Sequence, residues 1–273
     1  MKENNIICGN CVGALKEIPD ESIDLVVTSP PYDKLRKYKG YEFDFEEIAQ
    51  QLLRVVKKGG VVVWVVGDAT VRGSETGSSF RQALHFKDIG FNLHDTMIYQ
   101  KNSLPKNHRR YEQDFEYMFI LSKGKPKTFN PIKVKCKFPE KPTARQNSYF
   151  SETDEINRSA RSKKKRYPVK EYKIKGNIWK YLVGKNHSTK DKDAFKHPAI
   201  FPERLAEDHI LSWSNEGDVV LDPMCGSGTT CKMAAKNNRA YIGIDVSEEY
   251  CAIARERIRR IIYEQNISIS TEK

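Results

Sequence analysis

Residues 219–230 read Val-Val-Leu-Asp-Pro-Met-Cys-Gly-Ser-Gly-Thr-Thr, and this stretch decides the fold class. A short apolar strand ends at an acid, a turn with two glycines follows, and a helix is expected from Thr229. Residues 240–244 form the next apolar run, and Asp245 closes it. Strands that alternate with helices build parallel sheets, and ligands bind outside the carboxyl ends of their strands. The glycine turn and Asp245 therefore predict a ligand site at one edge of such a sheet.

The same alternation extends over most of the chain. Strands are expected at residues 5–8, 23–27, 61–66, 97–100 and 116–121, and helices at residues 11–17, 45–56, 78–89, 202–212, 229–237 and 247–263. Basic residues and glycines at 57–60 are expected to end the second of these helices. Between residues 131 and 196 the pattern decays into short β-prone pieces. We therefore expect a doubly wound α/β domain built from residues 1–130 and 197–265, an insertion at 131–196, and a disordered tail at 266–273.

Three kinds of ligand compete for the glycine turn. A triphosphate-binding loop has a lysine after its last glycine, but Gly228 is followed by two threonines. A dinucleotide-binding turn has a third glycine where Cys231 stands. S-adenosylmethionine carries a carboxylate, an amino group and a ribose but no phosphate, so the acids Asp222 and Asp245 at two strand ends suit it better. A purely structural turn is the alternative for any such glycine motif.

A second unusual stretch, Ser29-Pro30-Pro31-Tyr32, follows the strand at residues 23–27. The exocyclic amino groups of cytosine and adenine are weak nucleophiles because their lone pair is delocalised into the ring. The Ser29 hydroxyl and the Pro30 carbonyl can accept hydrogen bonds from such an amino group, and two consecutive prolines stiffen the backbone. Tyr32 can stack on a base that has been flipped out of a nucleic-acid double helix. The alternative is a turn that only ends a strand.

Together, residues 28–32 and 222–230 resemble the amino-methylating DNA methyltransferases of bacterial restriction–modification systems. Residues 197–205, His-Pro-Ala-Ile-Phe-Pro-Glu-Arg-Leu, resemble the segment that precedes the glycine loop in that family and helps to wall the methionine end of the cofactor. The order of the motifs along the chain resembles the permuted β group. The resemblance implies a Rossmann-like α/β fold that uses S-adenosyl-L-methionine, acts on double-stranded DNA, and reads its target with residues 131–196.

The resemblance also implies the roles of individual residues. The implied catalytic residues are Ser29, Pro30, Pro31 and Tyr32. The implied cofactor-binding residues are Asp222, Pro223, Met224, Cys225, Gly226, Ser227, Gly228, Thr229, Thr230, Asp245, Phe201 and Asn10. At the last of these positions the family often has an aspartate after glycine, so this chain departs from the pattern there.

The first residue of the tetrapeptide bears on the target base. Family members with Ser-Pro-Pro-Tyr mostly methylate N4 of cytosine, whereas Asp-Pro-Pro-Tyr goes with N6 of adenine. Ser29 therefore favours direct transfer to N4 of a flipped cytosine, and N6 of adenine is the alternative. Methylation at carbon 5 of cytosine needs a cysteine nucleophile, typically after proline, and the chain contains no Pro-Cys pair. Methylation of RNA or of a protein amide, and a non-catalytic DNA-binding module, are the alternatives from other classes.

The formal net charge of +11 is concentrated in one segment. Residues 131–196 contain 19 Lys and Arg against 7 Asp and Glu, whereas the rest of the chain is nearly balanced. Aromatic residues are interleaved with this charge, which is typical of contact with nucleic acid. A solvated charge run is the alternative for residues 163–166 taken alone. The expected DNA-binding residues are Lys163, Lys164, Lys165, Arg166, Arg109 and Arg110.

Bulk composition limits the class of protein further. The mean hydropathy is −0.66, and no apolar stretch approaches the roughly 18 residues that a membrane helix needs. The N-terminal residues do not have the pattern of a signal peptide, so we expect a cytoplasmic protein. We further expect a monomer or homodimer, and any cognate restriction endonuclease is expected to act separately. The six cysteines are expected to be free thiols. Cys8 and Cys11 have the spacing of half a zinc knuckle, but no second pair accompanies them, so no metal is expected.

Overall fold

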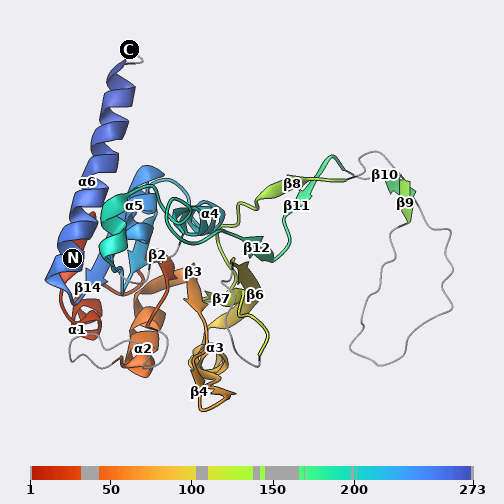
Figure 1. Ribbon diagram of the computed structural model, residues 1–273, viewed down its shortest axis with the longest axis horizontal. Coiled ribbons are helices and arrows are strands. Elements are labelled where there is room, and N and C mark those ends of the chain that lie inside the picture. Colours follow the sequence, from red (N-terminus) through yellow and green to blue (C-terminus); the bar gives the residue numbers. More distant parts are fainter. Residues whose placement is uncertain are drawn as a thin grey trace. The chain divides into compact units, whose positions relative to one another are not determined.

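A computed structural model describes residues 2–31, 43–102, 110–137, 142–144, 166–168, 170–197, 200 and 202–271 (Figure 1). The chain divides into two compact units. The first unit consists of Met1–Asn130 and Asn177–Lys273, and the second consists of Pro131–Gly176.

The first unit is built on an eight-stranded sheet with the strand order β1-β14-β13-β2-β3-β7-β6-β12. Its strands are β1 (Asn5–Cys8), β2 (Ile23–Thr28), β3 (Val56–Val66), β6 (Asn92–Gln100), β7 (Phe115–Ser122), β12 (Ile178–Lys180), β13 (Val219–Asp222) and β14 (Ala240–Asp245). Strand β7 runs antiparallel to β3 and β6, and all other neighbours are parallel. All strands except β7 therefore end at the same edge, which we call the carboxyl edge.

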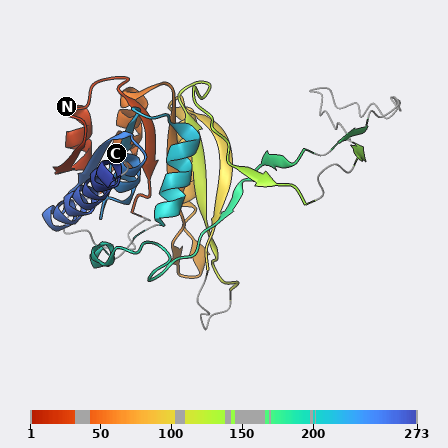
Figure 2. The same ribbon diagram turned by 90° about the horizontal axis from the view of Figure 1, so that it is seen from above.

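Helices cover both faces of this sheet. They are α1 (Cys11–Lys16), α2 (Phe45–Val55), α3 (Ser78–Asp88), α4 (Glu203–Trp213), α5 (Thr229–Lys236) and α6 (Glu248–Thr271), with a short 3-10 helix, η1 (Lys192–Lys196), before α4. A small hairpin, β4 (Thr70–Val71) with β5 (Ser74–Glu75), precedes α3. Figure 2 shows the sheet with its covering helices from a second direction.

The sheet is wound in two opposite directions from the boundary between β2 and β13. From β2 the chain passes through α2 to β3, whereas from β13 it passes through α5 to β14 on the other side. Because such crossovers are right-handed, α2 and α5 cover opposite faces of the sheet. Accordingly, α2 contacts α1 and β3, whereas α5 contacts α4, α6 and β13. The β2–β13 boundary is thus the topological switch point, where doubly wound sheets bind their ligands.

Burial on both faces explains the continuous apolar strands. Val26, Val62 and Leu221, from three neighbouring strands, are fully buried. The largest fully buried side chain is Trp64, whose indole nitrogen donates to the Gln82 side chain at 2.9 Å. The predicted doubly wound α/β sheet is confirmed.

Three predicted boundaries within the first unit are wrong. Strand β6 begins at Asn92 and not at residue 97. Strand β3 begins at Val56, which pairs with Ile23 of β2, and not at residue 61. Residues 57–60 therefore belong to this strand, and α2 ends before them at Val55. Backbone bonds hold this start of β3: Gly59 N donates to Lys123 O at 2.7 Å, and Lys123 N donates to Gly60 O at 3.1 Å. Residues 266–271 of the predicted disordered tail are helical instead, because α6 continues to Thr271.

The described residues of the second unit include two short antiparallel ribbons. Strand β8 (Lys133–Lys135) pairs with β11 (Tyr172–Ile174), and β9 (Pro142–Ala144) pairs with β10 (Arg166–Pro168). Residues 131–137 and 170–176 of this unit contain no buried side chain. Residues 177–196, which we had expected within the insertion, lie in the first unit, where β12 pairs with β6. Within the described residues, no helix has both the length and the apolar character needed to cross a membrane.

Candidate active site

The two unusual stretches of the sequence meet at the switch point. Val26 of β2 and Leu221 of β13 are partners in the parallel ladder. Beyond them, the buried Thr28 hydroxyl donates to Asp222 Oδ1 at 2.8 Å. The Thr230 hydroxyl, at the start of α5, donates to Val27 O at 3.0 Å. Two side-chain hydrogen bonds thus connect the end of β2, where the tetrapeptide begins, to the strand and helix on either side of the glycine turn.

The tetrapeptide follows this connection directly. Ser29 is partly buried, Pro30 is buried and Pro31 is partly buried. Tyr32 lies outside the described residues. Because Thr28 is the last residue of β2, the Ser29 hydroxyl and the Pro30 carbonyl lie at the carboxyl edge of the sheet.

Asp222 is a buried acid at the centre of this arrangement. Its carboxylate is 1% exposed, and Oδ1 accepts from Met224 N at 3.2 Å as well as from Thr28. Burial raises the pKa of Asp222 to about 6, and the hydrogen bonds from Thr28 and Thr230 oppose that rise. The ionised form therefore depends on the hydroxyl groups around it.

Both glycines of the turn adopt backbone conformations that favour glycine. Gly226 has φ +50°, and a Cβ there would lie 2.8 Å from His197 Nε2. Gly228 has φ +77°, and a Cβ there would lie 2.6 Å from Ala254 Cβ on α6. Any side chain at either position would therefore clash with a packed neighbour and strain the turn. The turn leads straight into α5, whose first helical residue is Thr229.

Asp245 holds the glycine turn from the neighbouring strand. Its Oδ2 accepts from Gly226 N at 2.9 Å, and its Oδ1 accepts from Ser247 N at 2.9 Å. The side chain is only partly buried, so its remaining lone pairs can reach a ligand. Asn10 lies beyond the end of β1, next to β14, where its side-chain oxygen caps α1 by accepting from Gly13 N at 3.1 Å. The carboxylate of Asp245 suits the hydroxyls of a ribose, and the glycine turn has no lysine for a phosphate. This arrangement fits a ligand that contains ribose but no phosphate.

Arg257 on α6 holds the glycine turn in place, a role that was not predicted from the sequence. The side chain is fully buried, and its guanidinium donates to both Ser227 O and Ser227 Oγ. The same group pairs with Asp191 at 2.8 Å and with Glu203 at 2.7 Å. The sequence contains one signal for this role, because Arg257 is a charged residue at a buried position of an amphipathic helix.

The segment before α4 packs on the glycine turn as well. His197 is 8% exposed, and its ring lies edge-on to Tyr250 at a centroid distance of 4.4 Å. The His197 ring also approaches Gly226 closely. Phe201, the expected wall of the methionine end, lies outside the described residues.

The cysteines near the site are poor nucleophiles. Burial, together with Asp222, raises the pKa of Cys11 to about 12. The pKa of the buried Cys225 is raised well above its ordinary value by its hydrogen bond with Cys231 and by burial. Thiols of this kind stay protonated at neutral pH, which disfavours a covalent mechanism through cysteine. Among the described residues, no three His, Cys, Asp or Glu side chains form a group that could hold a metal ion.

The expected DNA-binding residues are only partly described. Lys163, Lys164, Lys165 and Arg109 lie outside the described residues. Arg166 begins strand β10 in the second unit. Arg110 is exposed, and its guanidinium donates to Gly73 O at 2.8 Å and pairs with Glu75 at 3.3 Å in the β4–β5 hairpin.

The fold and the site together define a class, the Rossmann-like α/β methyltransferases that use S-adenosyl-L-methionine. A family model described as DNA methylase, for N6- and N4-methyltransferases, matches residues 23–256. The chain belongs to this family of amino-methylating DNA methyltransferases.

Known proteins that resemble this chain agree with that assignment. The chain is 58% identical over 255 residues to the orphan methyltransferase M.BamHII of Bacillus amyloliquefaciens, covering 90% of this chain and 92% of that one. It resembles the cytosine-N4-specific PvuII DNA methyltransferase in fold, with a TM-score of 0.65 and 22% identity over 96% of this chain and 92% of that one. A third protein, TTHA0409 of Thermus thermophilus, was crystallised with S-adenosyl-L-methionine. Its TM-score is 0.62, at 24% identity over 94% of this chain and 93% of that one.

Proposed function

We propose that this protein transfers a methyl group from S-adenosyl-L-methionine to the exocyclic N4 of a cytosine flipped out of double-stranded DNA. The observation that carries the proposal is the buried hydrogen bond from Thr28 to Asp222. It connects the strand end that leads into Ser29 and Pro30 with the acid that precedes the glycine turn. A base held by the first group and a cofactor held by the second would therefore face each other across the switch point.

The catalytic residues in this proposal accept hydrogen bonds. The Ser29 hydroxyl and the Pro30 carbonyl would accept from the two amino protons, which returns electron density to the nitrogen and aims its lone pair. Pro31 would stiffen the backbone, and Tyr32 would stack on the flipped base. S-adenosyl-L-methionine supplies an electrophilic methyl group on a positively charged sulfur. As the nitrogen–carbon bond forms and the carbon–sulfur bond breaks, the amino nitrogen loses one proton to solvent.

Positioning would then provide most of the rate. Because the nucleophile and the methyl group are both bound, the reaction needs alignment rather than a strong base. Pro30 is buried and the adjoining β2 lies within the core, so these acceptors are held by a rigid part of the fold.

The cofactor would lie along the carboxyl ends of β13 and β14. Asp245 would accept hydrogen bonds from the ribose hydroxyls, and Gly226 and Gly228 would let the ligand approach the backbone. Asn10, from the neighbouring β1, and Phe201, before α4, would complete the walls. The remaining residues of this proposed site belong to the same turn and to the helix start, namely Asp222, Pro223, Met224, Cys225, Ser227, Thr229 and Thr230.

Cytosine is favoured over adenine by the residue type at position 29. A neutral hydroxyl stands where relatives that act on adenine carry a carboxylate. The recognition of the surrounding sequence is assigned to residues 131–196, with Lys163, Lys164, Lys165 and Arg166 on the DNA backbone. Any restriction endonuclease that shares the target sequence would act as a separate protein.

Identification of the methylated nucleoside tests the proposal. Purified protein is incubated with methyl-deuterated S-adenosyl-L-methionine and unmethylated DNA of mixed sequence, and the digested nucleosides are analysed by mass spectrometry. Deuterated N4-methylcytosine supports the proposal. Deuterated N6-methyladenine would refute the assignment of the base. Absence of label from the DNA, with label found in a parallel incubation with RNA or protein, would refute the assignment of DNA.

A further inference from the structure

A connecting segment with an uneven charge distribution runs along the carboxyl edge. We call residues 181–197, which lead from β12 towards α4, the strap (Figure 2). At its first end, Tyr181 N donates to Gln100 O, the last residue of β6, at 2.9 Å. Val183 N then donates to Asn102 Oδ1 at 2.7 Å. The strap therefore begins at the carboxyl end of β6.

The other end of the strap lies against the glycine turn. Ser188 O accepts from Glu203 N at 2.9 Å, which ties the strap to the start of α4. At the end of the strap, the His197 ring lies close to Gly226 of the glycine turn. The strap thus passes from one end of the carboxyl edge to the cofactor side of the switch point.

The acidic residues of the strap face the protein. Asp191 pairs with the buried Arg257 at 2.8 Å, and its side chain is 12% exposed. Asp193 pairs with Arg260 at 2.8 Å. These ion pairs fasten the strap to α6 and neutralise its negative charges.

The lysines of the strap face solvent. Lys185, Lys190 and Lys192 are all exposed, and within the part of the chain that the structure describes none of them forms an ion pair. Lys196 differs, because it pairs with Asp193 at 2.9 Å. With the acids turned inwards, the strap presents three uncompensated positive charges at the carboxyl edge.

We propose that the strap binds the phosphate backbone of double-stranded DNA through Lys185, Lys190 and Lys192. The proposal rests on the proposed function, because a base inserted at the carboxyl edge brings the flanking phosphates to that edge. Lysine side chains are long enough to reach such phosphates, and each neutralised phosphate releases condensed counterions. The strap would supply affinity and register but no sequence reading.

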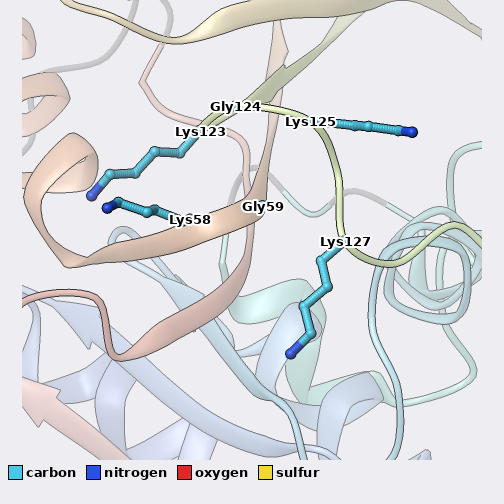
Figure 3. Close-up of a pocket in the computed structure, with 6 residues that line it drawn as sticks. All are labelled: Lys58, Gly59, Lys123, Gly124, Lys125 and Lys127. Atoms are coloured by element: carbon cyan, nitrogen blue, oxygen red, sulfur yellow. The ribbon is translucent and has the colours of Figure 1, made fainter.

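Exposed lysines at the opposite edge provide a matched control. Lys58, Lys125 and Lys127 line a shallow pocket around Gly59, where β3 begins and where the chain leaves β7 (Figure 3). The side chains of Lys125 and Lys127 point in different directions there. This edge lies away from the carboxyl ends of the strands, so the same loss of charge there leaves the proposed DNA contact intact.

The test compares the salt dependence of DNA affinity between two triple variants. One variant carries Lys185→Gln, Lys190→Gln and Lys192→Gln, and the other carries Lys58→Gln, Lys125→Gln and Lys127→Gln. Affinity for a duplex that contains the mapped target is measured by fluorescence anisotropy between 50 and 200 mM salt. Each phosphate contact contributes about 0.9 to the slope of log K against log salt, so loss of three reduces the slope by about 2.7. The wild type then loses about 40-fold more affinity than the strap variant over this range.

The controls separate this proposal from the proposed function. The control variant should keep the wild-type slope. A variant with Lys185→Arg, Lys190→Arg and Lys192→Arg should keep it too, because counterion release depends on charge. An unchanged slope in the strap variant, or equal changes in both glutamine variants, overturns the strap proposal. A wild type that neither binds nor methylates DNA overturns the proposed function itself. N6-methyladenine as the product would correct the base while leaving the strap proposal standing.

Discussion

Replacement of Thr28 by valine removes the hydroxyl that connects β2 to Asp222 while keeping the shape of the side chain. Thr28 is 0% exposed and Asp222 is 1% exposed, so water cannot replace the lost 2.8 Å hydrogen bond. A hydrogen bond to a charged group contributes about 1.5–3 kcal/mol, whereas one to a neutral group contributes about 0.5–1.5 kcal/mol. The cost of the substitution therefore depends on the ionisation of Asp222.

The pH dependence follows from the raised pKa of that acid. Because burial raises the pKa of Asp222 to about 6 from an ordinary 3.8, its stabilising contribution is complete below about pH 4 and is lost as the pH rises through 6. The Thr28 hydroxyl limits this loss by favouring the ionised form, and Thr28→Val raises the pKa further. We therefore expect Thr28→Val to lower the free energy of unfolding by about 1 kcal/mol at pH 5 and by about 2–3 kcal/mol at pH 8.

Urea unfolding monitored by circular dichroism at both pH values measures the difference. Thr28→Ser, which keeps the hydroxyl, should show no such increase between pH 5 and pH 8. In an Asp222→Asn background the cost of Thr28→Val should become independent of pH. A cost of Thr28→Val that is equal at the two pH values in the otherwise native protein would refute the reasoning.

Three further substitutions test separate parts of the site. Gly228→Ala should weaken S-adenosyl-L-methionine binding, measured by calorimetry, and should destabilise the fold by at least about 1–2 kcal/mol. The reason is that φ is +77° at this position and the new Cβ meets Ala254. An affinity equal to that of the wild type would contradict this expectation. Arg257→Met should cost about 3–5 kcal/mol of unfolding free energy, since it removes a fully buried guanidinium that bonds to Ser227, Asp191 and Glu203. Arg259→Met, on the exposed face of the same helix, should stay within about 0.5 kcal/mol. Ser29→Ala should slow methyl transfer by about 100-fold or more with nearly unchanged cofactor affinity, and an equal loss of both would argue against its role as an acceptor.

Much of the fold was predictable because local patterns and tertiary structure agree. The apolar run at residues 23–27 and the helical spacing at 45–56 are both present in the structure as β2 and α2, within one residue at each end. Short strands that are buried on both faces leave few alternatives for such runs. The glycine turn was predictable for a similar reason, because its conformation favours residues without a side chain.

The start of β3 and the end of α6 were decided by partners distant in sequence. Basic residues and glycines usually end a helix. Here the backbone of Lys123, which follows β7, forms hydrogen bonds with Gly59 and Gly60 and extends β3. The end of α6 is held by Gln265, whose side chain donates to Lys236 O at 2.7 Å on α5. No local pattern contains these contacts.

By itself, the sequence determined the chemical groups of the site and the order of the strands and helices that carry them, because residue type and periodicity are local properties. Only the tertiary structure decided that β2 and β13 are neighbours, that Thr28 binds Asp222, and that Arg257 holds the turn through Ser227. These contacts join residues far apart in the chain, and their strength comes from burial, which exists only once the sheet and its helices have packed together.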